Sequence, residues 1–381
     1  MAETTSDNLS LDSTTVRRSP LTHPNGTALL PYLSTTQQAV EASEATTQAE
    51  SVIVADRHDQ TSTLDSSDGG NGRNGATSAS ASTSIDSSVR DFLYENGRRY
   101  HRFRQGSYAF PSDDMEQERE DMKHAMLKLL CGQRLCYAPI GNVPQQILDL
   151  GTGTGAWAIE MADRYPSASV LGVDLSPIQP DWVPPNVRFE VDDVEAEWVH
   201  PPDHFDYIHS RHTVMAIKDW PRLLQRSMEH LKPGGWIELQ ELHHLPYSAN
   251  NSLTASHPVV QYWQHIDVGL AKLGVNLNAA AGDWLPNAMR EAGFANVTER
   301  VLHVPIGTWP RNRVLKTVGM YWRTILLDGL QAFALGPFTR GLRWSTEQTQ
   351  LFLVDVRKAY HDNSFLMYMP LRVIYGQKPQ Q

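Results

Sequence analysis

The sequence contains Gln146-Ile147-Leu148-Asp149-Leu150-Gly151-Thr152-Gly153-Thr154-Gly155-Ala156-Trp157, in which an apolar run leads into three glycines at alternate positions. The run, which only Asp149 interrupts, predicts a buried β-strand, and the residues from Ala156 onward have helical character. A strand, a glycine turn and a helix bring backbone N–H groups and a helix N-terminus close to a ligand. Glycine suits this turn because a Cβ would block close approach and because positive φ costs little without one.

The glycine turn by itself fits more than one kind of ligand. Gly151, Gly153 and Ala156 also satisfy the dinucleotide pattern G-x-G-x-x-G/A, so a nicotinamide or flavin enzyme is one alternative. A tight turn between strand and helix that binds nothing is another. The residues that follow the turn decide between these alternatives.

Length, charge and cysteine content exclude several classes of protein. The 381 residues are enough for one large domain or two ordinary ones, and the net charge of −10 argues against a general nucleic-acid binder. The two cysteines, Cys131 and Cys136, have no further ligands nearby, so no metal site or disulfide framework is predicted. No apolar run approaches the roughly 20 residues of a membrane span, and the N-terminus lacks a signal-peptide core. We therefore expect no membrane association and a cytoplasmic or nuclear location.

The composition of the chain changes near residue 90. Ser, Thr, Gly, Asp and Ala dominate residues 1–90, where Tyr32 is the only aromatic residue. Such a segment cannot bury enough apolar surface to offset the entropy of ordering, so we predict a disordered, low-complexity tail. Residues 91–379 are predicted to form one domain, which divides into a lid and helix, a cofactor-binding core and a substrate-side half (91–145, 146–245 and 246–379).

Apolar strands alternate with helices through this domain. Asp219 followed by Pro221 marks the start of one helix, and Gly293 marks the end of another. Such alternation predicts a parallel sheet with a ligand site at the carboxyl ends of its strands. The predicted fold class is α/β, a Rossmann-like doubly wound sheet of seven strands with a helical insertion between the sixth and seventh (147–150, 169–174, 187–191, 205–210, 236–239, 297–304 and 365–375).

Carboxylates stand at the ends of the second and third predicted strands. Asp174 lies 19 residues beyond Gly155, the distance at which a second strand presents a carboxylate to ribose hydroxyls. Asp192 and Asp193 end the third strand. These acids favour a ligand that contains a ribose, with the alternative for Asp192 and Asp193 that they cap the turn that follows.

Residues 94–108 alternate aromatic and basic side chains, which suits either a lid over the ligand or a strap packed on the domain. A helix then follows to about residue 130, capped by Ser112 or Asp113. Its predicted apolar stripe consists of Met115, Met122, Met126 and Leu129.

Taken together, these features resemble the class I S-adenosylmethionine-dependent methyltransferases and, more narrowly, the fungal LaeA-like family. The aspartate two residues ahead of the glycine motif and the Lys232-Pro233-Gly234-Gly235 turn favour this class over nicotinamide enzymes. The resemblance covers about residues 92–379. Thr152 stands where the family often has cysteine, a small change that should not block cofactor binding. The segments that carry the family resemblance are Glu95-Asn96-Gly97-Arg98-Arg99-Tyr100-His101, Phe110-Pro111-Ser112-Asp113-Asp114, Gly153-Thr154-Gly155-Ala156-Trp157-Ala158-Ile159, Gly172-Val173-Asp174-Leu175-Ser176-Pro177-Ile178-Gln179-Pro180 and Tyr375-Gly376-Gln377-Lys378-Pro379.

The resemblance implies S-adenosyl-L-methionine as the cofactor and assigns most of its contacts. The methionine moiety would lie over the glycine turn, and Asp149 would accept from its amino group or hold the loop. Asp174 would bind the ribose hydroxyls, and Asp193 or Asp192 would face the adenine amino group. The predicted cofactor-binding residues are Asp149, Gly151, Gly153, Gly155, Asp174, Asp192 and Asp193.

Methyl transfer is an in-line displacement from a sulfonium, and positioning the nucleophile can supply much of the rate. A base is required only when the acceptor is an oxygen or an unactivated nitrogen. Candidate bases follow the fourth and fifth strands, where Arg211 and His244 also lie. The predicted catalytic residues are His209, His212, Glu241 and His243.

The acceptor pocket is predicted to lie between the 94–108 strap and the helix that bears Tyr321 and Trp322. Aromatic walls suit a flat, apolar small molecule better than a basic protein tail. We therefore predict a methyltransferase of secondary metabolism with a small-molecule acceptor. The resemblance leaves two alternatives, a nuclear regulator of secondary metabolism that acts with velvet-type partners and a scaffold that binds cofactor without turnover.

Overall fold

The computed structural model describes residues 35–56, 92–95, 97–104, 106 and 108–380. Backbone contacts group residues 41–381 into one compact unit and residues 1–40 into another. In the smaller unit, residues 35–40 are described and form the first turns of a helix. The larger unit contains the central sheet, its helices and the candidate site.

The strands of the sheet are β3 Gln146–Leu150, β4 Ser169–Asp174, β5 Val187–Val191, β6 Phe205–Arg211, β7 Leu231–Leu242, β8 Tyr247–Ser248, β9 Ala295–Pro305 and β10 Met367–Gln377. Their order is β5-β4-β3-β6-β7-β10-β8, and β9 pairs with β10. Strands β3 to β7 run parallel to one another, whereas β10 runs antiparallel to β7, β8 and β9. This is the Rossmann-like sheet of seven strands that the sequence predicts, with the two-residue β8 added.

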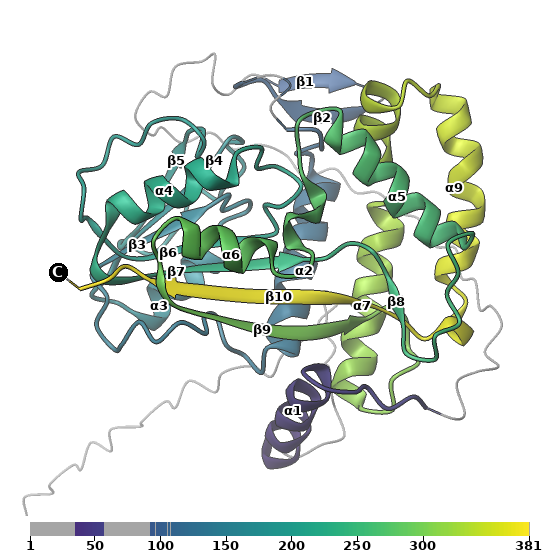
Figure 1. Cartoon of the computed structure of the whole chain (residues 1–381), viewed down its shortest axis with the longest axis horizontal. Coiled ribbons are helices and arrows are strands. Elements are labelled where there is room, and N and C mark those ends of the chain that lie inside the picture. The colour runs from purple at the N-terminus through teal and green to yellow at the C-terminus, as the bar shows by residue number, and fades with distance from the viewer. Residues whose placement is uncertain (1–34, 57–91, 96, 105, 107, 381) are drawn as a thin grey trace, which may run out of the picture. The chain divides into compact units, whose positions relative to one another are not determined.

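The helices around the sheet are α2 Asp114–Leu130, α3 Ala156–Arg164, α4 Trp220–His230, α5 Pro258–Ala271, α6 Trp284–Glu291, α7 Arg313–Asp328, α8 Leu330–Leu335 and α9 Thr346–Tyr360, with short turns η2 Leu277–Ala280, η3 Gly336–Gly341 and η4 Asn363–Phe365. Figure 1 shows that α5, α7 and α9 gather at one end of the long strands β9 and β10. The predicted insertion between the last two strands is present as α7, α8, η3 and α9. Among the described residues, no helix has both the length and the apolar character needed to cross a membrane.

Local sequence explains where these elements begin and end. The Asp113 side chain accepts from Glu116 N, so Asp113 and not Ser112 is the N-cap of α2. Asp219 caps α4 in the same way, with proline in the first turn. Gly293, at φ +97°, follows α6 in the left-handed conformation that glycine adopts most readily. The apolar residues of β3 and α3 then meet in one core, where Trp157 and Tyr207 are buried.

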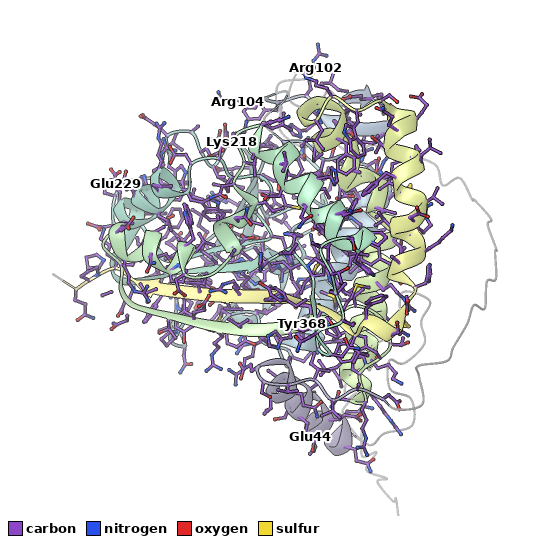
Figure 2. All side chains as sticks on the ribbon, turned by 45° about the vertical axis from the view of Figure 1, so that its right-hand side comes forward. Glu44, Arg102, Arg104, Lys218, Glu229 and Tyr368 are labelled. Carbon is purple, nitrogen blue, oxygen red and sulfur yellow. The ribbon has the colours of Figure 1, made fainter. Side chains whose placement is uncertain are left out.

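The predicted lid is a hairpin of β1 Phe92–Glu95 and β2 Arg98–His101, tied to the start of α2. Arg98 pairs with Asp113 at 2.5 Å, and Arg99 pairs with Asp114 at 3.1 Å. Beyond the hairpin, Arg102 and Arg104 lie at the outer edge of the molecule (Figure 2) and are exposed. Arg104 Nε nevertheless lies 3.8 Å from Asp193 Oδ2, so this segment reaches the carboxyl ends of the strands.

The apolar stripe predicted for α2 is wrong at its first residue. Met115 is 64% exposed, although Met126 and Leu129 are buried as expected. The buried face of the helix instead carries charged residues, among them Arg119 and Lys123. These charges tolerate burial because they pair with neighbouring carboxylates on the same helix.

The predicted disordered tail of residues 1–90 is wrong for residues 35–56, whereas residues 1–34 and 57–90 lie outside the described residues. Helix α1 Thr35–Ala49 and the segment after it are ordered, and within the larger unit Thr46 Oγ1 donates to Leu130 O at 3.0 Å. Arg311 N donates to Val54 O at 2.7 Å, and Asp56 N donates to Trp309 O at 2.7 Å. Buried Ala45, Ala49 and Ile53 and backbone hydrogen bonds dock this segment.

We expect Ala49→Asp to lower the melting temperature by about 4 °C or more. Ala49 is fully buried, and an unpaired carboxylate at such a site destabilises by roughly 2 kcal/mol, which is about this shift for a domain of this size. Thr47→Asp is the matched control because Thr47 is exposed on the same helix. Equal melting temperatures for the two variants, measured by circular dichroism, would show that the segment does not dock.

Candidate active site

A cavity of about 1020 Å³, open solvent at its mouth included, lies at the carboxyl ends of β3 to β6. The glycine turn and the ends of β4 and β5 form one side of it, and α2 with the segment before it forms the other. Its lining residues include Tyr108, Ser112, Glu116, Gln117, Glu120, Lys123, Gly151, Gly153, Asp174, Leu175, Ile178, Asp192, Asp193, Val194, Arg211, His212, Thr213 and Ile217.

All three glycines of the turn have positive φ, at +70°, +58° and +80°. A Cβ at Gly155 would lie 2.3 Å from the Phe189 ring, and a Cβ at Gly151 would lie 2.8 Å from Thr213 Cγ2. Gly153 differs, because a Cβ there would meet nothing within 4 Å. Gly153 lines the cavity, so the open space above its backbone is space that a ligand can occupy.

Asp149 and His209 lie side by side, and Asp149 also contacts the glycine turn. Their strands pair in register, and His209 Nδ1 lies 2.7 Å from Asp149 Oδ1. The other carboxylate oxygen of Asp149 accepts from Thr152 Oγ1 at 2.7 Å, and the His209 ring stacks on Trp157 with centroids 3.7 Å apart. Both residues border a smaller adjoining cavity and are absent from the lining of the main one. This geometry agrees with Asp149 as a loop-holding residue and separates His209 from a direct catalytic position.

The three acids at the strand ends line the main cavity together, as predicted. Asp174 accepts from Gly153 N and Ser176 N, both at 2.9 Å, and burial raises the pKa of Asp174 to about 6. Asp193 Oδ1 accepts from Glu195 N at 3.0 Å, so this residue caps the following turn while it also faces the cavity.

His212 is the predicted base that reaches the main cavity. Its backbone has φ +57°, an uncommon conformation for a residue other than glycine. Its Nε2 is buried and has no hydrogen-bond partner among the described residues. Burial, reinforced by the nearby Lys123 and Arg211 cations, holds the pKa of His212 well below its usual range. The ring is therefore neutral at physiological pH and can accept a proton or a hydrogen bond.

The other two predicted bases lie elsewhere. Glu241 accepts from Thr213 N at 3.0 Å, Thr213 Oγ1 at 2.8 Å and Val214 N at 3.0 Å, and burial raises its pKa to about 7. It thus shapes the loop after β6 without lining the cavity. His243 borders a separate cavity with His244 and Trp263. The candidate bases follow strands at the same edge of the sheet, but His209, His212 and His243 border different cavities.

The acceptor-side walls also differ from the prediction. Tyr321 and Trp322 are buried within the insertion and do not line the main cavity, although Tyr108 of the strap does. The wall facing the glycine turn is instead the polar face of α2. The residues on this wall that sequence reasoning missed are Glu116, Glu120 and Lys123, whereas Arg211, from the end of β6, was among the residues named after the fourth strand. The spacing of the three α2 residues, by four and then three positions, was the available signal, since it places them on one helical face.

Comparison with known proteins places this site in a family. A methyltransferase-domain model matches residues 119–299. Methyltransferase pytC of Aspergillus terreus is 40% identical over 303 residues, covering 79% of this chain and 92% of that protein. Secondary metabolism regulator LAE1 of Cochliobolus heterostrophus is 35% identical, covering 75% and 95%. Protein-methionine methyltransferase laeA of Emericella nidulans is 33% identical, covering 78% and 79%. The chain belongs to the LaeA-like family of S-adenosylmethionine-dependent methyltransferases.

The residues present fit S-adenosylmethionine. The unobstructed backbone at Gly153 leaves room beside the turn, and buried Asp174 offers a carboxylate to hydroxyl groups. Asp192 and Asp193, at the end of β5, add acceptors for an amino group in the same cavity. When bound, S-adenosylmethionine supplies a methyl group on a positively charged sulfur. The chain is thus a S-adenosylmethionine-dependent methyltransferase related to proteins of fungal secondary metabolism.

Proposed function

We propose that this enzyme methylates a small molecule with polar or ionisable groups. The observation that carries the proposal is the single cavity that joins the glycine turn and its acids to the charged face of α2. Because the cavity extends from the glycine turn to α2, an acceptor bound against α2 would lie beside the methyl donor. Because this wall is charged, we propose a polar acceptor in place of the apolar acceptor expected from the sequence.

His212 is proposed as the residue that receives the acceptor's proton. Its neutral ring borders the cavity with an unpartnered Nε2, and a hydroxyl or amine acceptor must lose a proton as it is methylated. Glu120 and Lys123 face the same space from α2 and are held together at 2.6 Å. This pair offers both an acceptor and a donor of hydrogen bonds with which to orient a polar substrate.

We expect His212→Phe to reduce turnover roughly 100-fold or more, the usual contribution of a general base, with S-adenosylhomocysteine affinity within about twofold. His243→Phe is the matched control and should retain full turnover, because His243 borders a different cavity. The assay uses purified protein, methyl-labelled S-adenosylmethionine and a whole fungal extract, whose small-molecule and protein fractions are separated after the reaction.

The same assay tests the acceptor class. Label in the small-molecule fraction supports the proposal. Label that appears only on protein overturns it and favours the protein acceptor that the name of the Emericella nidulans relative describes. Full turnover by His212→Phe overturns the role given to His212.

A further inference from the structure

Arg211 is placed beside the glycine turn by strand pairing. Ser210 pairs with Leu150, the last residue of β3, so the next residue of β6 emerges where the turn begins. Side chains alternate along a strand, which puts Arg211 on the same face as His209. Accordingly, Arg211 borders both the main cavity and the adjoining cavity of about 420 Å³ that the residues of the turn line.

Within the described part of the chain, Arg211 differs from its neighbouring cations because no carboxylate oxygen lies at ion-pair distance from its guanidinium. Arg119 pairs with Glu116 and Glu120, and Lys123 pairs with Glu120. The Arg211 guanidinium instead makes a hydrogen bond from its Nη2 to His124 Nδ1 at 2.8 Å. Burial lowers the pKa of His124, so this partner is neutral and contributes no countercharge. Asp149, Glu120 and Glu160 act on this half-buried guanidinium only from beyond ion-pair distance, so a ligand carboxylate in direct contact would stabilise it.

The guanidinium is also held in place. Because His124 Nδ1 accepts from Arg211, its Nε2 carries the ring proton, and that nitrogen lies 3.3 Å from Glu160 Oε1. Glu160 is fixed in turn by Lys128, 2.7 Å away. Residues of α2 and α3 therefore orient Arg211 before any ligand binds, as a binding site for a planar anion requires.

We infer that Arg211, positioned by His124 and Glu160, binds the carboxylate of the methionine half of the methyl donor. A guanidinium matches a carboxylate in geometry as well as charge, and this one faces the cavity beside the glycine turn. The inference depends on donor binding and not on the acceptor proposed above. A protein that binds donor as described but labels only protein would overturn the proposed function and leave this inference intact.

Two ligands separate a carboxylate contact from a general effect on the site. S-adenosylhomocysteine carries the carboxylate, whereas 5′-methylthioadenosine lacks the amino-acid part. We expect Arg211→Met to lower the affinity for S-adenosylhomocysteine roughly tenfold or more, the equivalent of one charge-assisted hydrogen bond. The affinity for 5′-methylthioadenosine should change by less than about twofold. Calorimetry on the full chain measures both affinities. Arg357→Met, at an exposed position on α9, is the matched control and should alter neither.

Further variants keep the test decisive. Arg211→Lys retains the charge and should recover part of the S-adenosylhomocysteine affinity. His124→Phe removes the acceptor that orients the guanidinium and should reproduce the selective loss in weaker form, even if Arg211→Met fails to fold. Equal losses for the two ligands, or no loss for either, would overturn the inference.

Discussion

Gly153→Val is expected to weaken S-adenosylhomocysteine binding by about 100-fold or more while the protein remains folded. The backbone of Gly153 has φ +58°, and a Cβ built there meets nothing within 4 Å because it enters the cavity. The valine branches would fill the space next to the turn that the ligand needs. A left-handed conformation costs a residue with a side chain roughly 1–2 kcal/mol, which a domain of this size tolerates.

Gly141→Val is the control for that backbone strain. Gly141 has φ +75° and open space around a built Cβ, but it lies outside the main cavity. Calorimetry should therefore find normal S-adenosylhomocysteine affinity in this variant despite a similar loss of stability. If both variants lose affinity to the same extent, blockage of the cavity is not the cause. Gly155 is unsuitable for the comparison, because its Cβ would clash with the Phe189 ring.

The order of strands and helices could be predicted because each has a local signal. The apolar run of β3, the glycines after it and the cap at Asp219 are all properties of neighbouring residues. The segment 41–56 escaped prediction because its docking uses Ala45, Ala49 and backbone hydrogen bonds. Counting large apolar residues gives no sign of such contacts.

The cofactor side of the site was more predictable than the acceptor side for a related reason. Asp174, Asp192 and Asp193 stand at strand ends, and the parallel sheet brings those ends to one edge. The polar wall of α2 depends on which helical face meets the cavity. The predicted stripe of methionines gave no sign of this wall, since paired charges can also be buried. The pairing of Asp149 with His209 needs the register of β3 and β6, which no local pattern contains.

Asp174→Ala is expected to lower S-adenosylhomocysteine affinity by about 100-fold or more. The carboxylate holds Gly153 N and Ser176 N and faces the cavity where the ribose is expected. Its removal therefore releases the turn and takes away a charged acceptor, each a loss of roughly 1.5–3 kcal/mol. Asp163→Ala, at an exposed position on α3, is the control and should bind normally. Normal binding by Asp174→Ala would show that Asp174 does not contribute to the ligand-binding site.

The pH dependence gives an independent test of the same residue. Burial raises the pKa of Asp174 from 3.8 to about 6 in the free protein. Because the ionised form is the better acceptor, ligand affinity should be full above about pH 6 and should fall as the pH drops below that value. Folding responds in the opposite direction, since a raised pKa makes this group's contribution to stability decline as the pH rises from 3.8 through about 6. A loss of binding below pH 6 therefore cannot arise from unfolding driven by Asp174, and Asp174→Asn should show no such step.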